Sequence, residues 1–119
     1  MNKDDQLYLI HIKECIDKID RYSANGRPEF FVNTMEQDAI VRNLQTLAES
    51  TQRLSEKTKL SKPEVDWRAI AGFRNVVVHD YLGVDLERIW HIIEFDLPSL
   101  KISIDELVVE SEEDRLQGS

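Results

Sequence analysis

The chain has 119 residues, 41% hydrophobic and 32% charged, a composition typical of one globular domain with a packed core. Its formal net charge of −8 argues against broad, sequence-independent binding to nucleic acid, which depends on phosphate neutralisation by Lys and Arg, so any contact with RNA must be local. No apolar run is long enough to cross a bilayer and the polar first residues do not resemble a secretory signal, so we expect no membrane partner and a cytoplasmic location.

The first element is predicted to be an amphipathic helix over residues 4–22. Its apolar residues recur at intervals of three and four, which is the spacing of one helix face rather than of a strand. The single cysteine, Cys15, falls within this helix, cannot form an internal disulfide and is expected to pack against the core. Gly26 and Pro28 follow closely and predict a loop over residues 23–28.

A second, long helix is predicted to follow, with Asn33 or Thr34 as its N-cap. Its apolar residues lie on one face as far as Leu54. Residues 55–63 are polar and rich in lysine, and their last residue is a proline that suits either a loop or the first turn of a helix.

A third helix is predicted to begin near residues 64–67, with Asp66 as a possible cap, and to lead into Arg74. The run of three β-branched residues at 76–78 favours a strand locally. A strand stays as the alternative here, although the sequence offers no second convincing strand with which it could pair.

The last helix is predicted to begin after Asp85, which can cap it, and to be kinked rather than ended by Pro98, because the helical apolar spacing continues beyond the proline. Residues 110–119 are acidic and polar without apolar periodicity, so we expect a flexible tail after a folded domain of residues 1–109. Four amphipathic helices with short connections predict an all-α, antiparallel up-down bundle.

One short segment concentrates the residues that could perform chemistry. Arg74 and Asn75 are followed by His79 and Tyr81, whereas the other two histidines lie alone on predicted helices, where packing or surface positions are usual. A guanidinium matches phosphate oxygens, and an imidazole can transfer protons near neutral pH. RNA carries its own nucleophile in the 2'-hydroxyl, so the segment suits RNA cleavage without a metal.

The geometry of a regular α-helix would place Asn75 and His79 nearly on one face but would separate Arg74 from His79 by roughly 140°. Arg74 would then need its long side chain, or a second subunit, to meet His79 at one phosphate. The alternative without function is that these polar side chains cap helix carbonyls and form an ordinary polar network.

The string from Arg74 to Tyr81 resembles the R-x4-H-x-Y motif of HEPN-domain toxins of the HepT type. Further stretches are similar to the same family: residues 29–31, 37–44 and 47–50 to its second helix, 63–73 to its approach to the motif, and 90–93 with 96–98 to its last helix. Ser50, Ala48 and Phe73 differ from the family's common residues but leave the motif intact.

The resemblance implies a HEPN-like homodimer that cleaves RNA without metal or cofactor, as the toxin of a type VII-like toxin–antitoxin pair, with both copies of the motif lining one cleft. Arg74 would hold the scissile phosphate, His79 would act as general acid or base, and Asn75 would orient either of them. The family's antitoxin is a minimal nucleotidyltransferase of the MntA type, and its implied target for transfer of AMP is Tyr81.

Two other functions stay open at the level of the sequence. Some HEPN domains bind nucleotides or substrates for a nucleotidyltransferase without cleaving RNA, and the acidic charge of this chain suits such a binding module. A dimeric scaffold is the third possibility. The identity of the RNA target and the position of cleavage do not follow from the sequence.

Overall fold

The computed structural model describes residues 1–76 and 86–117. The elements are α1 (Lys3–Tyr22), α2 (Arg27–Val32), α3 (Thr34–Gln52), α4 (Glu56–Leu60), α5 (Trp67–Ala71), the 3₁₀ turn η1 (Gly72–Asn75), α6 (Leu86–His91), the π-helical turn η2 (Ile92–Asp96) and α7 (Leu97–Gln117). These two ranges contain no strand, which confirms the all-α prediction.

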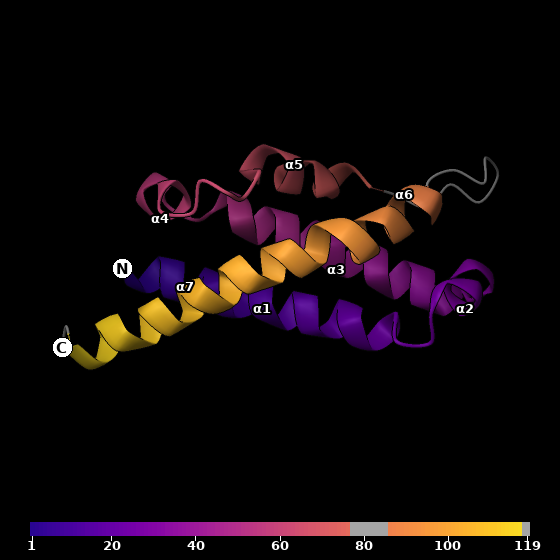
Figure 1. Cartoon of the computed structure of the whole chain (residues 1–119), viewed down its shortest axis with the longest axis horizontal. Helices are drawn as coiled ribbons and strands as arrows, with labels where there is room; N and C mark the ends of the chain where they lie inside the picture. The colour runs from indigo at the N-terminus through magenta and orange to yellow at the C-terminus, as the bar shows by residue number, and fades with distance from the viewer. Residues whose placement is uncertain (77–85, 118–119) are drawn as a thin grey trace.

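The helices run alternately in opposite directions along the long axis of the molecule (Figure 1). Helix α1 leads away from the N-terminus, α3 returns, α5 with η1 runs outward again, and α6 with α7 returns to the C-terminus. Helix α1 packs mainly on α3 and α7, whereas the short helices α4 and α5 lie on the far side of α3. The up-down topology expected from the sequence is therefore present, and its third member, α5 with η1, is short.

Side-chain caps begin two of the helices at the predicted places. The Asn33 side chain accepts a hydrogen bond from the backbone N–H of Glu36 at 3.0 Å, and the Asp66 side chain accepts one from that of Ala69 at the same distance. Each bond satisfies an N–H group that has no partner within its own helix. The caps at Asn33 and Asp66 confirm the predicted starts of α3 and α5, and Asn2 caps α1 in the same way.

The core is one continuous apolar cluster to which α1, α2, α3, α5, α6 and α7 contribute buried side chains. The side chains in it with less than 2% of their surface exposed include Leu9, Ile12, Ile16 and Ile19 from α1, Phe30 from α2, Ile40, Leu44 and Leu47 from α3, and Ile104 from α7. Cys15 is also buried, and its burial raises the pKa of its thiol. These positions repeat every three or four residues, which is the period that predicted the helices.

Two short helices, α2 and α4, lie outside the helices that apolar spacing predicted. Helix α2 follows Gly26, whose φ of +88° reverses the chain, and begins with Pro28 in its first turn, where a missing N–H costs nothing. Phe30 is fully buried and anchors it. Helix α4 begins at Ser55, whose hydroxyl accepts from the backbone N–H of Thr58. Five or six residues are too few to show a helical period in the sequence.

The last helix continues beyond Pro98, as predicted, and the irregularity lies just before the proline as η2. Pro98 has no N–H, and its ring would collide with the carbonyl four residues earlier, so a wider turn relieves the contact. Residues 110–117 remain helical instead of forming the expected frayed tail. Ser111 is buried there, and the N-terminal ammonium forms an ion pair with Asp114 at 2.9 Å.

Among the described residues, no helix is long and apolar enough to cross a membrane.

Candidate active site

Arg74 and Asn75 lie on the outward side of η1, the turn that continues α5. A 3₁₀ helix has three residues per turn, so residues three apart lie on the same side. Phe73 and Val76 are three apart and both are buried, with 3% and 1% of their surfaces exposed. They fix the turn to the core, and this register leaves Arg74 and Asn75 exposed to solvent.

Helix α3 holds the turn through two glutamines. The Gln45 amide donates to the carbonyl of Val76 at 2.7 Å, and the Gln52 side-chain oxygen accepts from Nη1 of Arg74 at 2.7 Å. The two glutamines are seven residues apart, which is close to two helical turns, so they lie on the same face of α3. One anchors the backbone of the motif and the other orients its guanidinium.

Sequence reasoning did not identify Gln45 or Gln52 as part of the site. Their spacing of seven residues on a predicted helix is the one signal, because it places two amides on the same face of the helix, where a neighbouring segment can pack along both. The signal is weak without knowledge of which segment packs there. The bond from Arg74 to Gln52 does not cap a helix carbonyl, but it is the kind of contact that the alternative of an ordinary polar network includes.

The helix that carries Arg74 ends before the motif does. Val76 has φ −75° and ψ 126°, which is extended backbone, so the α-helical geometry assumed for residues 75–79 is wrong at its first step. A β-branched residue at this place favours the extended conformation. The expected angle of roughly 140° between Arg74 and His79 therefore does not apply.

His79 and Tyr81 lie outside the described residues, as do Val77, Val78 and Asp85, so the convergence of Arg74 with His79 stays a prediction. The other two histidines are exposed: His91 packs its ring against Phe95, and His11 lies on α1. Both are on the surface, in agreement with their expected packing or surface positions.

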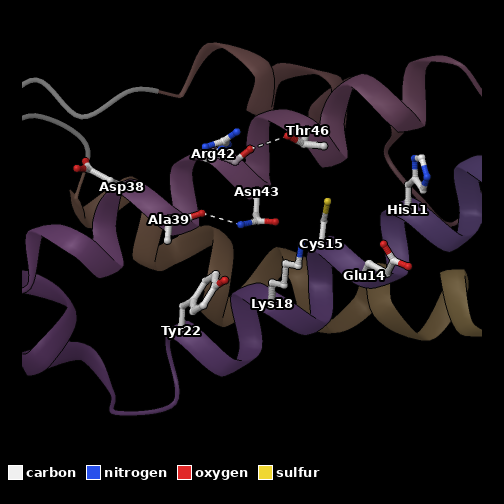
Figure 2. A pocket seen from close by; sticks show the side chains of 10 residues that line it. All are labelled: His11, Glu14, Cys15, Lys18, Tyr22, Asp38, Ala39, Arg42, Asn43 and Thr46. Carbon is white, nitrogen blue, oxygen red and sulfur yellow. Dashed lines mark hydrogen bonds between the residues drawn. The ribbon is translucent and has the colours of Figure 1, made fainter.

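A separate hollow of about 600 Å³ lies between α1 and α3 (Figure 2). Lys18 and Arg42 project into it from opposite walls, but Glu14 and Asp38 also line it, so its formal charges balance. Among its polar groups, the side chain of Asn43 donates to the carbonyl of Ala39, and the hydroxyl of Thr46 to that of Arg42. This hollow contains neither Arg74 nor Asn75.

Within residues 1–76 and 86–117, no group of three or more His, Cys, Asp or Glu side chains is arranged to hold a metal ion.

Comparison with known proteins gives consistent matches. The family model described as "Ribonuclease HepT-like" matches residues 12–107. A "Probable ribonuclease HepT" of Thermococcus cleftensis is 30% identical over 90% of this chain and 98% of its own length. A "Putative RNase" of Caldanaerobacter subterraneus is 30% identical over 85% of this chain and 91% of its own.

A longer relative from Methanocaldococcus jannaschii is named "Gamma-glutamylcyclotransferase and putative RNase". It is 29% identical over 97% of this chain, which spans about half of that relative's length (52%). No solved structure matches the chain.

Proposed function

Because the chain belongs to the HepT-like ribonuclease family, we propose that it is the metal-independent endoribonuclease toxin of a type VII-like toxin–antitoxin pair. The observation that carries the proposal is the placement of Arg74: an exposed guanidinium, on a turn anchored by two buried side chains and oriented by Gln52. A preorganised cation of this kind stabilises charge that develops on a phosphate.

In the proposed reaction the 2'-hydroxyl oxygen attacks the adjacent phosphorus. The new P–O2' bond forms as the P–O5' bond breaks, which yields a 2',3'-cyclic phosphate and a free 5'-hydroxyl. His79 takes the proton of the nucleophile or delivers one to the leaving oxygen. Arg74 binds the non-bridging oxygens as their negative charge increases, and Asn75 orients the phosphate or His79.

A homodimer is part of the proposal, because two copies of the motif facing each other across a two-fold axis would supply two imidazoles to one cleft. One imidazole could then serve each of the two proton transfers. Size-exclusion chromatography with light scattering checks this point, and a monomer with full cleavage activity would exclude the shared cleft.

The experiment that tests the nuclease is digestion of single-stranded RNA by the purified protein in EDTA. We expect His79→Ala and Arg74→Ala to lose at least roughly a hundredfold in rate, the scale of general acid–base and electrostatic contributions. His11→Ala and Arg21→Ala remove the same side chains from exposed positions elsewhere and should leave the rate unchanged. Wild-type protein that leaves RNA intact would refute the proposal.

Neutralisation is proposed to occur by transfer of AMP to Tyr81 from a minimal nucleotidyltransferase antitoxin. The phenolic oxygen would attack the α-phosphorus of ATP, pyrophosphate would leave, and the phenolic proton would pass to a base. The bulky adenylate carries a negative charge, so it would occupy the phosphate site near Arg74 and repel the RNA backbone.

Tyr81→Phe is expected to cleave RNA but to take up no AMP when incubated with the antitoxin and ATP, as measured by intact-protein mass spectrometry. Tyr8→Phe and Tyr22→Phe are the matched controls, since both residues lie on α1, and both variants should be modified fully. Uptake of AMP by Tyr81→Phe would contradict the assignment.

The second candidate is a binding module that partners a nucleotidyltransferase without cleaving RNA, and the net charge of −8 favours it. It predicts that the wild-type protein binds the nucleotidyltransferase but has no activity in the same digestion.

A further inference from the structure

Charge is distributed unevenly along this acidic chain. Residues 52–76 contain six Lys or Arg against three Asp or Glu, which gives this segment a net charge of +3. The rest of the chain therefore has a net charge of −11, and the two parts add to the total of −8. This segment comprises the end of α3, α4, α5 and η1, and it ends with Arg74 and Asn75. An attraction for a polyanion is therefore expected along this segment, which carries the motif arginine.

Two grooves flank α5, and their charges differ. The first, of about 420 Å³, lies between the end of α3, α4 and α5 and is lined by Lys59 and Arg68, with Glu56 as its one acidic residue. The second, of about 320 Å³, lies between α5 and the start of α7. Its charged lining residues are all acidic: Glu64, Asp66 and Asp96. A phosphate backbone passing α5 would be drawn to the first groove, here called the basic groove.

The basic groove adjoins Arg74. Gln52 lines the groove, and its side-chain oxygen accepts the hydrogen bond from Arg74 Nη1 at 2.7 Å. One side chain thus belongs to both features. The guanidinium of Arg74 and the basic groove therefore meet at Gln52.

The walls of the basic groove suit a nucleotide. The indole N–H of Trp67 donates to the carbonyls of Lys59 and Lys62 at 3.0 and 3.3 Å, which fixes a partly exposed ring, and Leu60 and Pro63 extend the apolar surface. Aromatic surface between cations is the combination with which proteins bind single-stranded nucleic acid.

The cations differ in their availability. The Lys59 side chain is 18% exposed and its ammonium contacts Glu56 at 3.9 Å, while the Glu56 side chain is 83% exposed, so water screens the pair. Arg68 is exposed. Lys62, in contrast, is buried between Glu106 and Glu110 at 3.5 Å from each and is already neutralised.

We propose that the basic groove is a subsite for the RNA strand next to the scissile phosphate, in which Lys59 and Arg68 bind backbone phosphates and Trp67, Leu60 and Pro63 contact a base. The inference rests on the proposed nuclease function and deepens it, because it gives the direction in which the bound RNA strand extends from Arg74. The subsite contacts substrate beyond the reacting atoms, so it contributes affinity for long RNA rather than chemistry.

The test is binding of a fluorescently labelled single-stranded RNA of about eight nucleotides, measured by anisotropy over a range of salt concentrations. All proteins carry His79→Ala so that the RNA stays intact. Lys59→Gln with Arg68→Gln removes both groove charges and retains part of each apolar stem. The matched control is Lys18→Gln with Arg42→Gln, which changes the net charge equally in the hollow between α1 and α3.

We expect the groove variant to bind at least about tenfold more weakly at 0.1 M salt and to lose about 1.4 from the slope of log K against log salt, the value for two phosphate contacts on a single strand. The control should retain both values, and the melting temperatures of the variants should agree. Equal losses in both variants, or no loss in the groove variant, would overturn the proposal.

Cleavage by proteins with His79 intact separates this inference from the nuclease proposal. The groove charges should matter for a long RNA but not for a dinucleotide, whose single phosphate is held by Arg74. RNA binding that depends on the groove without any cleavage would refute the nuclease alone. If substitution of Lys59 and Arg68 left the rate of cleavage of long RNA unchanged, the subsite alone would be refuted.

Discussion

The frame of three long helices and the corner formed by α4, α5 and η1 are held together in different ways. In the frame, α1, α3 and α7 share a continuous apolar seam, and exposed ion pairs such as Lys13 with Asp105 at 2.7 Å lie outside it. In the corner the helices have four or five residues, and a few buried side chains (Ile70, Phe73 and Val76) together with individual polar contacts attach them to the frame. The candidate site lies in the corner.

Besides the ion pairs of Lys62 with α7, polar contacts connect the corner to the frame at three further points. Asp5 on α1 accepts hydrogen bonds from the residues that begin α4, Gln45 reaches the carbonyl of Val76, and Gln52 reaches Arg74. Apolar burial is non-directional, whereas a hydrogen bond specifies position to a few tenths of an ångström. The frame therefore supplies stability, and the polar contacts supply the placement of functional groups.

The largest effect is expected from a cavity in the frame. Leu9→Ala should lower the free energy of unfolding by about 2–5 kcal/mol, because Leu9 is fully buried. Leu7→Ala makes the same change two residues earlier in α1, where 57% of the side chain is exposed, and should change it by less than about 0.5 kcal/mol. Urea denaturation measures both. Equal losses of unfolding free energy in the two variants would contradict the assignment of Leu9 to the apolar seam and of Leu7 to the surface.

An intermediate effect is expected from the contact between frame and corner at Asp5. Its carboxylate is 2% exposed and accepts from the Ser55 backbone N–H at 2.9 Å and from the hydroxyls of Ser55 and Thr58 at 2.6 Å each. Asp5→Asn should cost about 1–3 kcal/mol, because it leaves buried donors poorly matched. Asp4→Asn, exposed in the same turn of α1, removes an equal charge and should cost less than about 1 kcal/mol.

The Asp5 contact also predicts a dependence on pH. Burial raises the pKa of Asp5, but the hydrogen bonds from Ser55 and Thr58 outweigh it, so the pKa lies below its ordinary value. The stabilisation is therefore present above the unfolded-state pKa of about 3.9 and is lost as the pH falls through the lower folded-state pKa. Denaturation of wild type and Asp5→Asn should show the difference between them shrinking below about pH 4. A constant difference would exclude ionised Asp5 as the cause.

The contrast between frame and corner also explains what the sequence could predict. The period of apolar residues in α1 and α3 and the caps at Asn33 and Asp66 are local signals, so these two long helices and the starts of α3 and α5 followed from the sequence. The roles of Gln45 and Gln52 depend on contacts between residues 22 and 31 positions apart. No local pattern encodes such pairs.

The helical end of α7 shows the same limit. Residues 110–117 have no apolar period, yet they continue the helix, and two of them have distant partners: Lys62 from the corner contacts Glu110, and the N-terminus contacts Asp114. Their partners lie far away in the sequence. Residue chemistry and resemblance led to Arg74 and Asn75 as candidates, whereas the 3₁₀ turn that exposes them had no signal in the sequence.

The smallest change in stability is expected from substitution of Gln52. This substitution tests whether a polar contact between frame and corner matters for function. Gln52 is exposed, so Gln52→Ala should change the free energy of unfolding by less than about 0.5 kcal/mol. The Arg74 guanidinium would lose the acceptor that orients it, and kcat/KM for RNA should fall about tenfold, since misplacement of a charged donor weakens transition-state binding. Glu49→Ala, exposed one turn earlier on α3, is the control and should leave cleavage unchanged. A Gln52→Ala protein with wild-type kcat/KM would show that the turn η1 orients Arg74 without help from α3, and the polar contacts of the corner would then matter for stability alone.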